Sequence, residues 1–134
     1  MSESDKTEKI TVNLGLVDLG QIDLLVQEGF YANRTDFLRA ATRNQLSAHS
    51  DAVNQTVARK TLALGVRHVT AAELEKHQAA ASKVHIRVLG LATIASDVSP
   101  ELAAATIESV EVLGAFRASA EVKAALAQRT LGGR

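Results

Sequence analysis

Three polar side chains near the amino terminus, Lys9, Thr11 and Asn13, alternate with apolar ones. Their ammonium, hydroxyl and amide groups supply the hydrogen-bond donors and acceptors that suit a polar partner such as the edge of a nucleic-acid base. Side chains on a strand point alternately to opposite faces, so a strand over residues 9–14 would place all three on one face.

The intervening side chains, Ile10, Val12 and Leu14, would form an apolar face on the other side of this strand. A strand with one apolar and one polar face is typical of a half-buried ribbon. An isolated strand cannot satisfy its backbone groups, and no second good strand lies within the next 45 residues. The nearest partner is the same strand of a second copy, which predicts an obligate homodimer.

A second polar group, Asn33-Arg34-Thr35, stands where a helix is expected to begin. Asn33 has the short acceptor side chain of an N-cap, and Asp36 three residues later completes a variant of the capping box. The free amides of a helix start point outward at the positive end of the helix dipole, which makes a natural phosphate site.

Two helices must position these residues. Apolar residues recur at spacings of three and four over 16–28, and Gly29 suits the left-handed residue that closes a helix. A second apolar stripe, which includes Phe37, Leu38 and Leu46, predicts a helix from Asn33 onward. Residues 47–60 would continue that helix or link it to the rest of the chain.

This order of strand, helix, hinge and helix resembles a ribbon-helix-helix domain, the fold of MetJ and Arc. The hinge sequence over residues 29–37, followed by Leu38-Arg39, carries the resemblance, which covers about the first 50 residues. It implies that the strands of two chains pair and enter the DNA major groove. The residues expected to contact base edges are Lys9, Thr11 and Asn13. Those expected to hold backbone phosphate are Asn33, Arg34 and Thr35.

The balance of basic and acidic residues does not indicate a polyanionic partner. The chain has 15 basic and 15 acidic residues and a pI near 6.9, and residues 1–50 contain five basic and seven acidic residues. Because phosphate contacts dominate DNA affinity, we expect modest binding per dimer, with several dimers side by side. The absence of cysteine, of a signal peptide and of a transmembrane run fits a cytoplasmic protein.

Three glycines in the second half occupy similar settings, Gly65, Gly90 and Gly114, at spacings of 25 and 24 residues. Alternating strands precede two of them, and capping residues start a helix after each one. The capping residues are Thr70, Ser99 before Pro100, and Ser119. This pattern predicts three units of strand, glycine turn and short helix, over 61–82, 83–109 and 110–129. The alternative is an ordinary α/β domain in which the glycines coincide by chance.

The expected fold is therefore α+β, a ribbon-helix-helix dimerisation domain followed by a small, solenoid-like β/α repeat domain. The expected segments are a mobile arm (1–8), the ribbon-helix-helix domain (9–50), a helical linker or helix extension (51–60), the repeat domain (61–129) and a tail (130–134). Few repeats leave apolar ends and strand edges, which invite assembly with another copy.

No catalytic, cofactor or metal site is expected. The histidines are His49, His68, His77 and His85, and they lack the close pairing of a metal site, while no cysteine can complete a set. No glycine-rich phosphate loop, nucleophile elbow or paired carboxylates occur. The chain is not expected to be an enzyme.

The expected function is a bacterial or phage DNA-binding transcriptional regulator, with repression as the default outcome. Its partners would be double-stranded DNA and itself, as a dimer that assembles further through the repeats, with no membrane association. One alternative is a self-assembling structural protein whose first domain dimerises it or tethers it to DNA. Another is an antitoxin, although antitoxin segments that bind the toxin are usually disordered when free, and this one is patterned enough to fold.

Overall fold

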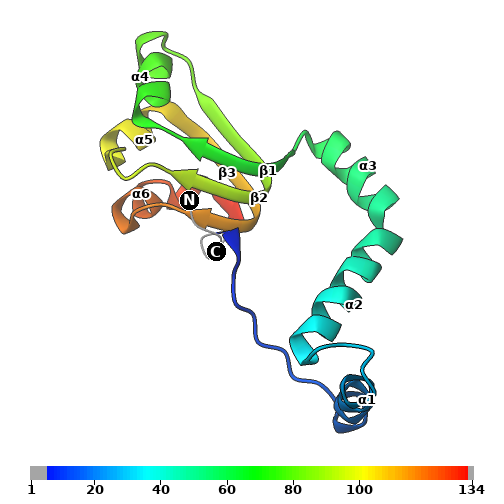
Figure 1. Cartoon of the computed structure of the whole chain (residues 1–134). Coiled ribbons are helices and arrows are strands. Elements are labelled where there is room, and N and C mark those ends of the chain that lie inside the picture. Colours follow the sequence, from blue (N-terminus) through cyan, green and yellow to red (C-terminus); the bar gives the residue numbers. More distant parts are fainter. Residues whose placement is uncertain (1–5, 133–134) are drawn as a thin grey trace. The chain divides into compact units, whose positions relative to one another are not determined.

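The computed structural model describes residues 6–132 of the chain. Two compact units, drawn in Figure 1, make up these residues: Thr7–Thr56 is one, and the described residues from Val57 onward together with Lys6 are the other. Most of the arm that is expected over residues 1–8 lies outside the described residues.

Two helices account for most of the N-terminal unit. Helix α1 spans Leu16–Gln27 and α2 spans Arg34–Ala48, close to the two helices expected from the apolar spacing. Between them Gly29 has φ 86°, the left-handed conformation predicted for the residue that closes the first helix. The helix α2 ends at Ala48 and a separate helix, α3 (Ser50–Lys60), follows, so the helical continuation is interrupted at one residue, His49.

The strand predicted over residues 9–14 does not form within the single chain, where residues 7–15 have no regular secondary structure. The physical reason is that a strand takes its ladder hydrogen bonds from a neighbour, and the described Thr7–Thr56 unit contains no other strand. Within this unit only Ile22 is buried. One copy of the N-terminal unit therefore has almost no core of its own.

The C-terminal unit is a four-stranded parallel sheet in the order β1-β2-β3-β4, with a helix in each connection (Figure 1). The strands are β1 (Ala63–Val69), β2 (Val84–Ile94), β3 (Ile107–Arg117) and β4 (Thr130–Gly132). The helices are α4 (Ala71–Ala79), α5 (Pro100–Thr106), α6 (Ala120–Ala125) and the short 3-10 helix η2 (Ala127–Arg129). Each strand thus lies beside the next one along the chain, as expected for stacked repeats.

One apolar core holds this unit together. Leu74 of α4, Ala103 of α5 and Val122 of α6 pack in a single buried cluster with strand residues such as Ile86 and Val110. Contacts join α4 to α5 and α5 to α6, so the three helices lie side by side against one face of the sheet. That arrangement follows when successive parallel crossovers have the same hand.

The three repeated glycines form a column across the sheet. Gly65 pairs in register with Gly90, and Gly90 with Gly114. Their φ angles are 125°, 138° and 118°, and a Cβ on Gly90 would lie 2.2 Å from the carbonyl oxygen of Gly65. The expected glycine turn is therefore not a turn between elements, because each glycine lies inside a continuous strand and bends it.

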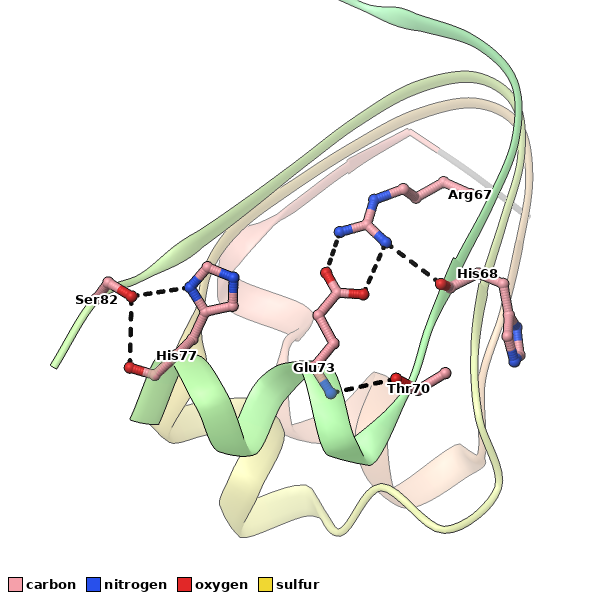
Figure 2. Close-up of polar contacts among 6 residues, drawn as sticks. All are labelled: Arg67, His68, Thr70, Glu73, His77 and Ser82. Atoms are coloured by element: carbon pink, nitrogen blue, oxygen red, sulfur yellow. Dashed lines mark hydrogen bonds and ion pairs between the residues drawn. The ribbon is translucent and has the colours of Figure 1, made fainter. Parts of the chain in front are cut away.

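The predicted helix starts in this unit are confirmed. The side chains of Thr70, Ser99 and Ser119 each accept a hydrogen bond from the amide three residues on. The sequence Thr70-Ala71-Ala72-Glu73 also predicts a full capping box, but its Glu73 half is wrong, since the Glu73 carboxylate pairs with Arg67 of β1 instead (Figure 2). The expected tail also differs, because Thr130–Gly132 forms β4 beside β3.

Candidate nucleic-acid interface

An open groove of about 760 Å³ lies between the segment over residues 7–14, before α1, and the helix α2. Ile10, Val12 and Leu14 line it from the segment, and Leu38 and Arg39 are among the residues that line it from α2. The apolar side of the predicted strand therefore faces α2. This is the orientation that the alternation of residues 9–14 predicts.

The three residues expected to read base edges are all exposed. Thr11 and Asn13 do not belong to the described lining of the groove, as the alternation predicts, whereas Lys9 is one of the lining residues and so departs from the predicted polar face. The segment thus presents two of its polar side chains away from α2. Their hydroxyl and amide groups remain accessible to a partner.

The apolar side of the same segment is exposed as well. Ile10 and Val12 keep 73% and 58% of their surface accessible in the single chain, although both face the groove. Exposed apolar patches of this kind, with polar residues at the rim, mark interaction surfaces. The groove is therefore open to a further apolar element.

The predicted cap at the start of α2 is confirmed. The Asn33 side-chain oxygen accepts a hydrogen bond from the Asp36 amide at 2.7 Å, and the Asp36 carboxylate accepts one from the Ala32 amide at 3.0 Å. Tyr31 and Phe37 pack edge to face across this hinge, with ring centroids 5.1 Å apart. The hinge is therefore held in shape by polar and aromatic contacts together.

Asn33→Ala is expected to reduce the free energy of unfolding of the N-terminal unit by about 1 kcal/mol, because the cap to the Asp36 amide is lost. The matched control is Asn44→Ala, which alters an exposed asparagine inside α2. Thermal unfolding followed by circular dichroism measures both. Equal stability of the two variants would contradict the capping role.

Arg34 makes a contact that the sequence did not predict. Its Nε and Nη2 donate to the two carboxylate oxygens of Asp23 on α1, at 2.7 and 2.8 Å. This hydrogen bonding lowers the pKa of Asp23 and raises the pKa of Arg34. The contribution of the pair is complete above the ordinary carboxyl pKa and is lost as the pH falls through the lowered pKa. Both side chains are about half exposed, so the contribution to stability is small.

A guanidinium group carries five N–H donors, and Asp23 accepts from two of them. Arg34 can thus be oriented by Asp23 and still donate to an anion. Thr35 is exposed beside it and lines the groove. Arg39 and Arg43 also line the groove from successive turns of α2, and only their four-residue spacing could have signalled this.

The four histidines each have a hydrogen-bonding neighbour. His77 of α4 contacts Ser82, His68 contacts Thr93, His85 contacts Ser109 and His49 contacts Gln45. Figure 2 shows that His68 and His77 point in different directions, with the Arg67–Glu73 ion pair between them. Arg67 lowers the pKa of Glu73 chiefly through its hydrogen bonds. Among the described residues no three histidine, aspartate or glutamate side chains converge as metal ligands.

The sequence pattern of the Ribbon-Helix-Helix transcriptional regulator family matches residues 5–123. The chain belongs to this family. The match extends well beyond the N-terminal part on which the resemblance rested and includes β1, β2 and β3. No curated protein and no solved structure matches the chain.

Members of this ribbon-helix-helix family are DNA-binding transcriptional regulators. None of the helices in the described part of the chain is long and apolar enough to cross a membrane.

Proposed function

We propose that this ribbon-helix-helix protein binds specific DNA sequences as a dimer and represses transcription. The observation that carries the proposal is the segment over residues 9–14, whose apolar side faces α2 while Thr11 and Asn13 lie outside the groove. Pairing of this segment with its copy in a second chain would form a two-stranded ribbon. A two-stranded ribbon fits the DNA major groove.

Dimerisation would also supply the core that a single N-terminal unit lacks. Only Ile22 is buried there in one copy, while Ile10, Val12, Leu14 and Leu38 remain exposed around the groove. A paired ribbon would lay the apolar side chains of both strands over the helices of both chains. At about 25 cal/mol per Å² of buried apolar surface, this is the natural source of stability for the unit.

In the proposed complex, Lys9, Thr11 and Asn13 contact base edges. Lysine suits guanine acceptors and asparagine suits the donor and acceptor pair of adenine. The helix start formed by Asn33, Arg34 and Thr35 holds backbone phosphate and so sets the position of the ribbon on the duplex. Asp23 offsets part of the Arg34 charge, which agrees with modest binding per dimer.

Arg34→Ala is expected to weaken binding to all sequences about equally. The slope of log affinity against log salt concentration should fall by about one unit for each phosphate contact removed. Asp23→Asn is the informative partner variant, because it frees the guanidinium from the ion pair and should strengthen binding to any sequence. A changed sequence preference with an unchanged salt slope in Arg34→Ala would contradict the phosphate role.

The C-terminal unit is proposed to join dimers, so that adjacent sites are occupied cooperatively and a promoter is covered. The second candidate function is that of a self-assembling protein that the N-terminal unit tethers to DNA. The edge strands of the sheet favour it, because an open edge can pair with another copy. The antitoxin alternative is less consistent with a C-terminal unit that has its own buried core. A regulator of this kind would act in the cytoplasm.

Selection of bound duplexes from a random pool, followed by footprinting, tests the proposed function directly. We expect enrichment of a short sequence with two-fold symmetry, since each chain of a dimer would read one half-site. Light scattering of the same sample gives the particle size. Binding without any sequence preference, by a large polymer, would favour the tethering alternative over the regulator.

A further inference from the structure

The two outer strands of the sheet are each incomplete, in complementary ways. The pairing of β1 with β2 begins at Ala63 opposite Val88, so β1 covers only the later part of β2. Within the described residues, the pairing of β4 with β3 reaches Gly132 opposite Val112, so the described part of β4 covers only the earlier part of β3. Among the described residues, 113–116 of β3 have no strand neighbour on the β4 side.

The glycine column is incomplete in the same sense. Positions 90 and 114 must be glycine because a carbonyl oxygen of the previous strand lies too close for a side chain. A Cβ atom on Gly90 would lie 2.2 Å from that oxygen, and one on Gly114 would lie 2.1 Å from it. Gly65 has the same left-handed bend, with φ 125°, yet nothing lies within 4 Å of its Cβ position. The edge strand thus has the backbone shape of a strand that stacks on another carbonyl.

The exposure of equivalent side chains shows what one further strand would cover. Val66, Leu91 and Ala115 are register partners on β1, β2 and β3 and form one row across the sheet. The edge residue Val66 is 57% exposed, whereas Leu91 in the second strand is 6% exposed. In the row Leu64–Leu89–Leu113, the first and last leucines are 67% and 47% exposed. Apolar side chains therefore face outward at both ends of the stack.

We propose that β1 of a second copy of this chain pairs in parallel with 113–116 of β3, in the half-layer that β4 leaves open. The register that continues the column places Gly65 of the incoming copy beside Gly114, so that the Gly114 carbonyl meets the Cα of Gly65. In this register both Ala63 of the incoming copy and Gly132 would lie opposite Val112, so the incoming strand pairs from Leu64 onward, beyond the last described residue of β4.

This register also matches the side-chain rows. Leu64 of the incoming copy lies beside Leu113, Val66 beside Ala115, and Arg67 beside Phe116, whose ring already has Lys123 over it at 5.9 Å. The helix α4 of the incoming copy follows α6 in the row of helices. The contact joins two different surfaces, so a two-fold dimer does not satisfy it and further copies can add head to tail. It rests on the assembly role proposed above and defines its geometry.

Cysteine cross-linking tests this register, because the chain contains no cysteine of its own. Within one chain, positions 64 and 113 are separated by two strand spacings, roughly 9.6 Å, beyond the limit of about 7 Å between Cα atoms for a disulfide. Leu64→Cys and Leu113→Cys alter exposed side chains, so both variants should fold. Each is oxidised alone, as an equal mixture, and as the double variant, with and without plasmid DNA.

The expected result is a covalent dimer in the mixture, none with either variant alone, and a ladder of products beyond the dimer for the double variant. The matched control is His68→Cys with Leu113→Cys, four residues out of register, which should give no product. Cross-linking of Leu64→Cys alone would show that β1 pairs with β1, and a double variant that stops at dimers would show a closed contact. Either result, or no cross-link under both conditions, overturns the proposal.

DNA binding by the same samples keeps the two proposals separate. A register-specific ladder from protein without sequence preference would leave this inference standing and reject the regulator. Sequence-specific binding by protein that gives no cross-link would do the opposite.

Discussion

Replacing Thr11 and Asn13 together with alanine is expected to lower the affinity for the preferred DNA sequence by roughly 30-fold to 25,000-fold at each half-site. Each well-paired contact to a base edge contributes about 1–3 kcal/mol of discrimination, and two such contacts are lost from each chain. Binding to unrelated DNA should change little, since neither side chain carries charge. Titration of labelled duplexes with preferred and scrambled sequences measures the difference.

The fold of the double variant should be intact, because both side chains are exposed and neither belongs to the described lining of the groove. Asn54→Ala with Thr56→Ala is the matched control, since it removes the same two residue types from α3. The control should bind as the parent does. An unchanged sequence preference in the Thr11 and Asn13 variant would reject base recognition by this segment.

Gly90→Ala is expected to unfold the C-terminal unit or to destabilise it by at least roughly 3 kcal/mol. The left-handed φ of 138° alone costs a residue with a side chain about 1–3 kcal/mol. In addition, the new Cβ would lie 2.2 Å from the Gly65 carbonyl oxygen, a backbone atom that cannot move without separating β1 from β2. Denaturant unfolding of the full chain, followed by circular dichroism, measures the loss.

Two further glycine variants serve as graded controls. Gly65→Ala in the full chain should be destabilised by the backbone strain alone, because nothing lies within 4 Å of its Cβ position. Gly20→Ala, in the middle of α1 and equally uncrowded, should be stabilised by up to about 1 kcal/mol. If Gly90→Ala and the parent protein unfolded at the same denaturant concentration, the glycine column would not hold the strands together.

The features that could be predicted from the sequence are those that depend on neighbours a few residues apart. The caps at Asn33, Thr70, Ser99 and Ser119 were predicted correctly, because a side-chain acceptor and the amide three residues on form a local contact. Family membership was predicted for the same reason, since the hinge between the two helices is a contiguous motif. The glycine period also appeared in the sequence, because each repeat is one continuous stretch.

The tertiary structure alone decided which distant residues meet. The ion pair of Arg34 with Asp23 joins two helices whose packing no periodicity specifies. The pairing of Thr130–Gly132 with β3 depends on an open strand edge that exists only after the sheet has formed. The glycines proved to lie inside strands rather than between elements, because Gly90 and Gly114 let one strand approach the carbonyl of the strand before it.

The segment over residues 9–14 shows both what the sequence alone determines and what it leaves to the tertiary structure. Its alternation determines which side chains share a face, since that depends only on the two-residue period of an extended chain. Whether the segment becomes a strand depends on a hydrogen-bonding neighbour, and the described residues of the N-terminal unit contain none. The sequence by itself therefore determined the faces, caps and repeats, while pairing partners were decided in three dimensions, because ladder hydrogen bonds and ion pairs join residues that no local pattern relates.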